Sequence, residues 1–256
     1  NQKTGIFRIG DQVYDDTWQQ TLDVWFPVQM DHVTVNEGYR VWHGAAHLDD
    51  AVQAPLNHQH FDGFRMGDTT ETRYKPLERI PGMNIGGWFD AGDYDLRTAS
   101  HCVTVSSLAE AWEHFGIKRD ETLVNQAQRF VDIHHPDGHP DIVQQVEHGA
   151  LNLIAQHRAF GRAITTIIEP NLHQYHHLGD AVNITDNHPY NPRLKPYQTD
   201  GKTSGTPDDR YVFTNRSSRA NYSSLVALSN ASRALKGYNN DLSTECLETA
   251  KKLWAD

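Results

Sequence analysis

The chain has 256 residues, 38% of them hydrophobic and 22% charged, as in folded globular proteins and unlike disordered ones. Its net charge of −10 argues against a nucleic-acid partner, because nucleic-acid phosphates require a basic face. No apolar run reaches the length of a membrane span, and the first residues lack a signal-peptide pattern. We therefore expect a soluble protein with no membrane partner. Asn1 can follow a removed segment, so secretion and the compartment stay open.

Apolar residues that recur at steps of three and four predict helices along most of the chain. These helices cover residues 11–26, 95–115, 120–133, 141–157, 220–235 and 242–254. Gly116 stands where a left-handed C-terminal cap belongs. No run of alternating β-branched residues predicts a strand, so the expected fold class is all-α, built from helix pairs. Two stretches without a helical period, 38–94 and 161–216, are expected to be site-forming loops.

The two cysteines, Cys102 and Cys246, lie far apart in helical apolar patterns, so we expect buried free thiols. Several tryptophans also follow the helical period. The tryptophans expected in the core are Trp18, Trp25, Trp112 and Trp254.

The richest stretch for chemistry is Gly86-Gly87-Trp88-Phe89-Asp90-Ala91-Gly92-Asp93-Tyr94-Asp95. Asp90 and Asp93 flank a small Ala-Gly pair that lets the backbone turn and expose both carboxylates. The predicted helix starts directly behind them, and its positive end favours the ionised form of a carboxylate. Such a group can act as a general base toward water, and a second carboxylate can hold that water in line.

Two structural alternatives exist for these aspartates. An Asp before a helix often serves only as an N-cap. The carboxylates could also belong to a calcium site, but the D-x-D-x-D-G spacing and the late Glu of a calcium loop are absent.

The acidic turn closely resembles the GGW(Y/F)DAGD signature of glycoside hydrolase family 9, the cellulase-type enzymes. The resemblance extends along the chain to three further segments and a hairpin. His47-Leu48-Asp49-Asp50-Ala51 is similar to the family's H-x-D-D-A segment, the 141–157 helix to its D-(E/I)-(L/V) helix, and His176-His177-Leu178-Gly179-Asp180 to its V-G-D loop. The last two helices fit its alanine-rich hairpin.

This resemblance implies an (α/α)6 barrel and inverting hydrolysis of β-1,4-glycosidic bonds. By matching position, Asp93 is expected to be the general base and Asp90 the carboxylate that helps hold the attacking water. In an inverting glycosidase the acid lies about 6.5–9.5 Å from the base, so it must come from another segment.

The first departure from the family pattern concerns the general acid, a Glu in an N-E motif near the end of the catalytic domain. No such segment occurs here. We therefore expect residues 1–256 to be a partial catalytic domain, about the first half of the barrel, and inactive alone. The acid is expected beyond residue 256, and the rest of the same domain is an expected partner.

The second departure is Ala46, where relatives often place a Cys that contributes to a structural zinc site. A zinc site here would rest on His43, His47, His58 or His60 with carboxylates. These histidines are instead expected to order loops or contact substrate. No cofactor is expected to be required, and structural calcium or zinc is not the favoured interpretation.

Sugar sites combine aromatic platforms with polar groups that fix hydroxyls. The loop residues that fit these roles are Trp42, Trp88, His173, Tyr175, His188, Tyr190 and Tyr197. For each aromatic residue, packing in the core is the structural alternative.

The expected partner is an oligo- or polysaccharide, with cellulose-type β-1,4-glucan as the family's common substrate. The loops also resemble those of marine-bacterial members that act as exo-β-D-glucosaminidases on chitosan oligosaccharides. A glucosamine ammonium would need a carboxylate, for which Asp49, Asp50 or Asp62 could serve. Two other classes stay open, a non-catalytic carbohydrate-binding fragment and a His-rich metal-binding protein.

Overall fold

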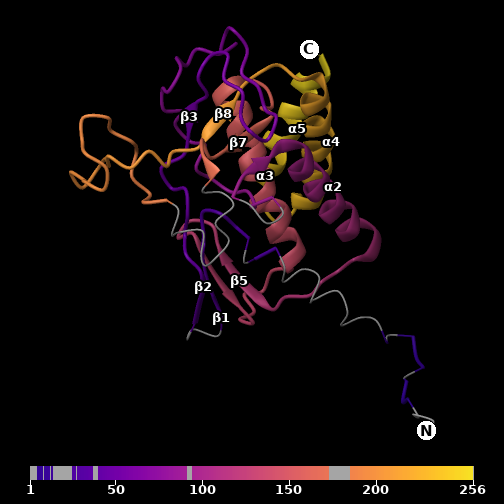
Figure 1. The fold of residues 1–256 in the computed structure, drawn as a ribbon. Helices are drawn as coiled ribbons and strands as arrows, with labels where there is room; N and C mark the ends of the chain where they lie inside the picture. Colours follow the sequence, from indigo (N-terminus) through magenta and orange to yellow (C-terminus); the bar gives the residue numbers. More distant parts are fainter. Residues whose placement is uncertain are drawn as a thin grey trace.

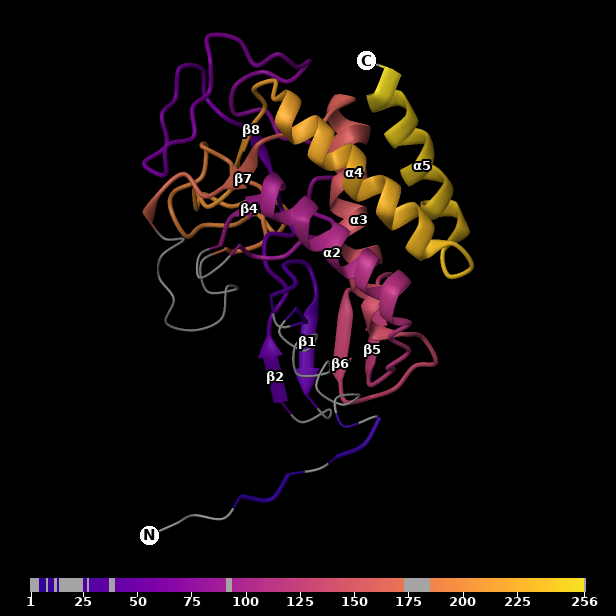
Figure 2. The same cartoon turned by 90° about the vertical axis from the view of Figure 1, so that its right-hand side faces the viewer.

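The computed structural model describes residues 5–7, 9–11, 13, 25–26, 28–36, 40–90, 94–172 and 185–255. Within these residues four helices pack side by side (Figures 1 and 2). They are α2 (Thr98–Phe115), α3 (Asp141–Phe160), α4 (Ser218–Leu235) and α5 (Asn240–Ala255). The helix predicted over 11–26 falls almost entirely outside the described residues. No described helix is long and apolar enough to cross a membrane.

Two four-stranded mixed sheets accompany the helices. One has the order β2-β1-β6-β5, from β1 (Val33–Asn36), β2 (Arg40–His43), β5 (Thr122–Asn125) and β6 (Phe130–Ile133). The other has the order β3-β8-β7-β4, from β3 (Val52–Gln53), β4 (Leu96–Arg97), β7 (Thr166–Ile168) and β8 (Tyr211–Phe213). In the second sheet β4, which leads into α2, lies at the edge opposite β3.

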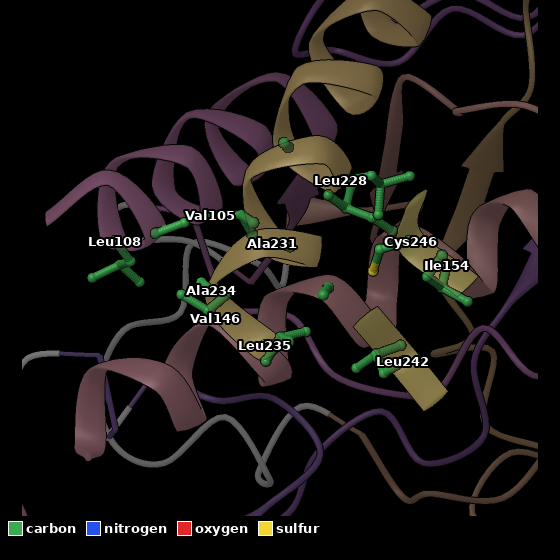
Figure 3. Packing of buried hydrophobic residues seen from close by; sticks show 14 of the residues in the cluster. Val105, Leu108, Val146, Ile154, Leu228, Ala231, Ala234, Leu235, Leu242 and Cys246 are labelled. Carbon is green, nitrogen blue, oxygen red and sulfur yellow. The ribbon is translucent and has the colours of Figure 1, made fainter. Parts of the chain in front are cut away.

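The helices share one apolar core, to which α4 contributes three alanines and two leucines (Figure 3). Ala227, Ala231 and Ala234 are buried at spacings of three and four, so one face of α4 can approach α2 and α5 closely. Cys246 of α5 is buried in this core, and Cys102 of α2 is buried as well. Both cysteines are free thiols, as predicted, and burial raises the pKa of each to about 12.

Four helix predictions are confirmed, with ends shifted by a few residues. The helix expected from residue 95 begins at Thr98, because Leu96 and Arg97 pair with β7 instead. Gly116 ends α2 in the left-handed conformation, with φ of 59°. Ser217 caps α4 by accepting a hydrogen bond from the backbone N–H of Ala220.

The all-α prediction is wrong, because the described residues also contain the two sheets. The helix predicted over 120–133 is instead the hairpin of β5 and β6. Arg129, with φ of 53°, turns the chain just before β6, and β6 pairs in parallel with the distant β1. The other missed strands have two to four residues, and β7 is buried throughout, so it shows no alternation.

The tryptophans are only partly in the core. Trp25 and Trp112 are partly buried and pack against the helical core, as predicted. Trp254 follows the helical period but is 78% exposed at the end of α5, so its placement in the core was wrong. Trp18 lies outside the described residues.

Candidate active site

The glycine turn before the predicted catalytic carboxylates lies tightly against α3. Gly86 and Gly87 have φ of 63° and 94°, a region that side chains other than glycine rarely adopt. A Cβ atom at Gly86 would lie 2.4 Å from the carbonyl oxygen of His148. A Cβ atom at Gly87 would lie 2.5 Å from Leu96. The two glycines therefore let the turn pass between α3 and β4.

Polar side chains hold this turn in place. His148 of α3 donates from Nε2 to the carbonyl oxygen of Gly87 at 2.9 Å. The Asp31 carboxylate accepts from the N–H of Gly86 at 3.0 Å and pairs with His32 at 3.0 Å. Burial alone would raise the pKa of Asp31, but these hydrogen bonds and the neighbouring histidines lower it to about 2. Asp31 is thus a fixed anion that positions the turn.

The turn ends at Asp90, whose half-buried carboxylate lies beside the start of α2. The Ser100 hydroxyl, in the first turn of α2, donates a hydrogen bond to Asp90 Oδ2. The Asp90 N–H donates to the carbonyl oxygen of Asp95 at 3.0 Å. The predicted position of this carboxylate near a helix N-terminus is therefore confirmed for Asp90, whereas Asp93 lies outside the described residues.

Asp90 opens onto a small cavity of about 140 Å³. Its lining combines aromatic rings with a few polar groups: Trp25, Trp88, Phe89, Asp90, Arg97, Ser100, His101 and Thr104. Sugar sites share this combination of apolar ring faces and hydrogen-bonding groups.

Arg97 supplies the cationic group of this cavity. Its Nε donates to Asp95 Oδ2 at 2.6 Å, and its Nη2 lies 3.7 Å from the Asp62 carboxylate. Its guanidinium also stacks over Phe64, 5.6 Å from the ring centre. Neither Arg97 nor Ser100 stood out in the sequence, and the only available signal was their place directly after the acidic turn.

His101 lies on the same wall and is neutral at ordinary pH. Burial lowers its pKa to about 4, against weaker opposing effects of Asp90 and a hydrogen bond to Gly149. The Asp90 carboxylate therefore faces an uncharged imidazole.

The sequence-predicted substrate contacts do not all reach this cavity. Trp88 lines it but is 4% exposed, and its Nε1 donates to Gln145 at 3.1 Å in the core. His173, Tyr175 and the side chain of Trp42 lie outside the described residues.

His188, Tyr190 and Tyr197 lie in another loop of the chain. Tyr190 is 42% exposed and borders a second cavity of about 400 Å³. That cavity is lined by Val52, Leu77, Arg79, Pro170, Pro189, Tyr190, Pro192, Pro207, Asp209 and Tyr211. It borders β3, at the sheet edge opposite β4, so it is separate from the Asp90 cavity.

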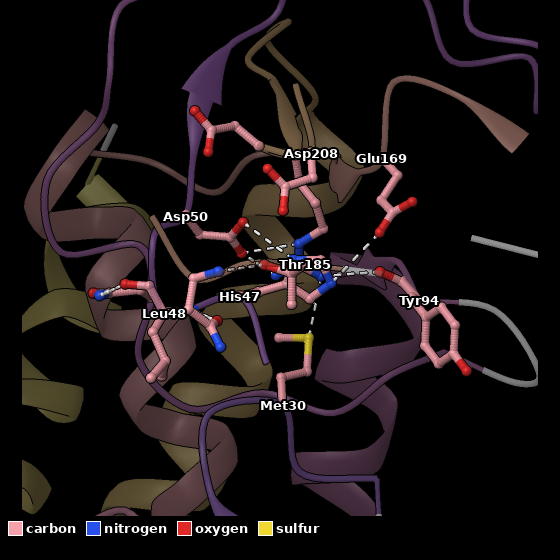
Figure 4. A network of polar contacts seen from close by, with 12 residues as sticks. Met30, His47, Leu48, Asp50, Tyr94, Glu169, Thr185 and Asp208 are labelled. Atoms are coloured by element: carbon pink, nitrogen blue, oxygen red, sulfur yellow. Dashed lines mark hydrogen bonds and ion pairs between the residues drawn. The ribbon is translucent and has the colours of Figure 1, made fainter. Parts of the chain in front are cut away.

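Arg210 and Asp50 form a buried ion pair (Figure 4). Arg210 Nε donates to Asp50 Oδ2 at 2.9 Å, and its Nη1 donates to the carbonyl oxygen of Tyr94 at 3.1 Å. Burial raises the pKa of Asp50 to about 6, although Arg210 acts in the opposite direction. The pair therefore links the H-x-D-D-A segment to Tyr94, just after the acidic turn.

Further carboxylates surround this pair, more than Arg210 can neutralise. Burial is the main cause that raises the pKa of Glu169 to about 8, of Asp208 to about 7 and of Asp209 to about 8. Figure 4 shows Glu169 and Asp208 pointing toward the region of the ion pair. This arrangement could not be predicted from the sequence, because Asp50 lies more than a hundred residues before Glu169, Asp208 and Asp209.

Of the four histidines considered for zinc, His47, His58 and His60 have described side chains, whereas that of His43 lies outside the described part of the chain. His60 Nε2 donates to the carbonyl oxygen of Glu169 at 2.8 Å, and His58 packs edge-on against Tyr211. His47 is buried, with ring nitrogens 3.7 Å from Asp50 and 3.7 Å from Glu169. The absence of a required zinc remains a prediction.

Comparison with known proteins matches residues 14–256 to the family described as Glycosyl hydrolase family 9. Endoglucanase D of Acetivibrio thermocellus is 30% identical over 116 residues, which cover 44% of this chain and 15% of the relative.

Solved structures show the same fold over the matched region. A metagenome-derived family 9 endoglucanase aligns with a TM-score of 0.61 at 18% identity, covering 94% of this chain and 35% of that chain. The thermostable D468A endoglucanase of Alicyclobacillus acidocaldarius aligns with a TM-score of 0.58 at 18% identity. The alignment covers 95% of this chain and 37% of that chain. The chain thus spans little more than a third of these structures. With the family match extending over nearly its whole length, the chain belongs to glycosyl hydrolase family 9.

Proposed function

We propose that this chain carries the water-activating side of an inverting glycoside hydrolase that cleaves β-1,4-glycosidic bonds of glucan. In this proposal Asp93 is the general base, and Asp90 holds the attacking water. The helices are part of an (α/α)6 barrel, and the general acid is a Glu beyond residue 256. Family membership supports the glycosidase class, and the geometry around Asp90 supports the site.

The observation that carries the proposal is the Asp90 carboxylate at the edge of an aromatic cavity, fixed by Ser100. One oxygen is held by the hydroxyl, so the carboxylate has a defined orientation and keeps lone pairs for a water molecule. Asp93 follows three residues later in the chain, and the proposal requires it to take a proton from that water. A base and a water-holding carboxylate on one turn leave the opposite sugar face to a distant acid, as inversion requires.

The walls of the cavity support a sugar substrate. Trp25 and Trp88 lie 5.5 Å apart between ring centres, and Phe89 completes the apolar side. Arg97 also lines the cavity, and a guanidinium can donate to sugar hydroxyl groups. A relative in complex with a cellobiose-like isofagomine, with a TM-score of 0.53, makes a cellulose-type glucan the first choice.

A second candidate is exo-β-D-glucosaminidase activity on chitosan oligosaccharides. Of the three carboxylates predicted to hold the ammonium, Asp49 and Asp50 are 2% and 1% exposed, and Asp50 is paired with Arg210. Asp62 is more open, with 14% of its side chain exposed, and it lies 3.7 Å from the cavity residue Arg97. Asp62 is therefore the carboxylate that favours this candidate.

The test is Asp93→Ala in the intact protein, assayed on cello-oligosaccharides and chitosan oligosaccharides. Loss of a general base lowers the rate by about 10²–10⁴-fold, so hydrolysis should be abolished while the far-ultraviolet circular dichroism is unchanged. Asp68→Ala, which removes an exposed loop carboxylate, is the control. Retained activity above a few per cent in Asp93→Ala overturns the base assignment. Binding of oligosaccharide without hydrolysis by the wild type would favour the non-catalytic alternative.

A further inference from the structure

Three buried aspartates meet where the H-x-D-D-A segment approaches the start of β8. Asp49, Asp208 and Asp209 are 2%, 5% and 6% exposed. One carboxylate oxygen from each lies within 4.8 Å of the others. This spacing allows one small ion to contact all three, since calcium–oxygen distances are about 2.3–2.6 Å.

Their oxygen atoms lack the partners that buried carboxylates normally have. Asp49 and Asp209 interact with each other, but neither oxygen of Asp49 accepts a hydrogen bond from a described donor outside the cluster. Oδ1 of Asp208 and Oδ1 of Asp209 also lack such a donor. A buried carboxylate without a donor is costly, so such atoms require an explanation.

The Oδ2 atoms of Asp208 and Asp209 accept hydrogen bonds from the backbone. The N–H of Asp186 donates to Asp208 Oδ2 at 2.6 Å, and the N–H of Tyr190 donates to Asp209 Oδ2 at 2.9 Å. Each carboxylate is therefore held from one side, and its unpartnered Oδ1 is left for another contact. Outer hydrogen bonds of this kind orient metal ligands in proteins.

The local charges also call for a cation. Arg210 lies close enough to act on Asp49, but its guanidinium is already committed to Asp50 and to the carbonyl oxygen of Tyr94. Three carboxylates cannot remain ionised together in a buried site without a compensating positive charge.

We propose that Asp49, Asp208 and Asp209 bind a calcium ion. The three donors are carboxylate oxygens, the ligands that hard cations prefer. Calcium fits better than magnesium, because magnesium keeps several waters and the cluster is almost fully buried. Asp209 lines the cavity of about 400 Å³, which gives an ion a path from solvent.

Two neighbouring clusters do not share these features. In the group of Asp31, His32 and His148, the Asp31 carboxylate already accepts hydrogen bonds from His32 and Gly86. In the group of His47, Asp49 and Asp50, the last carboxylate is paired with Arg210. Asp49 is thus the member of that group left for the calcium site.

The site ties three distant segments together. The calcium ion would join the segment after His47, the backbone that carries Asp186 and Tyr190, and the entry to β8. Because calcium binds only the folded arrangement, it should stabilise the protein and order the Tyr190 loop. The site is independent of the proposed catalytic roles of Asp90 and Asp93.

The experiment compares thermal unfolding of wild-type protein, Asp49→Asn, Asp208→Asn and the exposed-loop control Asp68→Asn. Each protein is stripped with chelator and then titrated with Ca²⁺ or Mg²⁺, and calorimetry measures the ion stoichiometry. The wild type and the control should bind one Ca²⁺ and gain roughly 5 °C or more in Tm at saturating Ca²⁺. Both cluster variants should lose that response, while their ion-free Tm stays at or above that of the wild type because a repelling charge is removed.

The possible results distinguish whether a calcium ion or bound protons neutralise the three carboxylates. A wild-type Tm that does not respond to Ca²⁺, together with higher Tm values in both variants, would mean that protonation neutralises the cluster and would overturn the proposal. An equal Ca²⁺ response in the wild type and the cluster variants would place the ion elsewhere and would also overturn it. A stronger response to Mg²⁺ than to Ca²⁺ would overturn the assignment of the ion.

Discussion

The Ser100 hydroxyl donates a hydrogen bond to the Asp90 carboxylate, and this contact joins the acidic turn to the first turn of α2. The turn reaches this position because Gly86 and Gly87 pass close to α3 and β4, where no side chain could be accommodated. The orientation of the proposed water-holding group therefore depends on the packing of a helix and a strand.

Ser100→Ala should lower kcat on a β-1,4-linked oligosaccharide by about 10-fold with little change in KM, because a hydrogen bond to a charged group contributes about 1.5–3 kcal/mol. Asp90→Ala should lower kcat further. Steady-state kinetics on the intact protein measure both effects. Ser107→Ala, on the exposed face of α2, is the control. Ser100→Ala with wild-type kcat would show that the contact does not position Asp90.

Gly149→Ala should destabilise the protein by about 1–3 kcal/mol or more, because overpacking a core forces shifts in its neighbours. A Cβ atom there would lie 2.4 Å from Trp88 and 2.5 Å from Val105. Urea unfolding monitored by circular dichroism measures the loss. Val103→Ala, at a position that is 65% exposed on α2, should change stability much less. Equal stability of the two variants would contradict the packing of α3 against Trp88.

Arg210→Met should destabilise the protein by about 3–5 kcal/mol, because it leaves the Asp50 carboxylate buried without its partner. The double variant Arg210→Met with Asp50→Asn should recover part of that loss. The contrasting pair is Arg233 with Glu113 on the surface, where Arg233→Met should cost about 1 kcal/mol or less. Chemical denaturation of all variants gives these values. A smaller effect at Arg210 than at Arg233 would contradict the buried-pair assignment.

The contribution of His157 to the stability of the protein should fall as the pH drops from about 6.5 toward 4. Burial lowers the pKa of His157 to about 4, so between this value and the ordinary 6.5 the unfolded chain binds a proton that the folded chain does not. The His157 contribution to stability therefore rises with pH across that window and falls on acidification, opposite in sign to that of the buried carboxyl groups with raised pKa. His157→Gln can keep the contact with the Ser224 hydroxyl but cannot titrate, so it should take up about one proton fewer on unfolding. Denaturation between pH 4 and 7 measures the slope, and an unchanged slope would contradict the assignment.

The helices could be predicted from the sequence because their signals are local. α3 and α4 show apolar spacing of three and four, and Gly116 marks the end of α2. The hairpin of β5 and β6 could not be predicted from the sequence, because its apolar residues fit a helical period equally well. Its pairing with β1 joins residues almost a hundred positions apart, which local patterns do not encode.

The acidic turn could also be found from the sequence, because its carboxylates, glycines and aromatics are adjacent. The groups that hold this turn in position could not be found from the sequence. Arg210 and Asp50 are 160 residues apart, and the proposed calcium site joins residue 49 to residues 208 and 209. Such sites arise from the tertiary fold and leave no periodic pattern. Trp254 shows the converse error, since its helical spacing suggested burial although it is 78% exposed.

The proposed inverting hydrolysis is tested most directly by the anomeric configuration of the first product. The intact protein is incubated separately with cellotetraose and with a chitosan tetramer, and proton NMR follows the new anomeric signals before mutarotation equilibrates them. The proposal predicts that the α anomer forms first from cellotetraose and that Asp93→Ala forms no product. Faster cleavage of the chitosan tetramer would select the glucosaminidase candidate, again with the α anomer first. Initial release of the β anomer from either substrate would contradict the proposed mechanism.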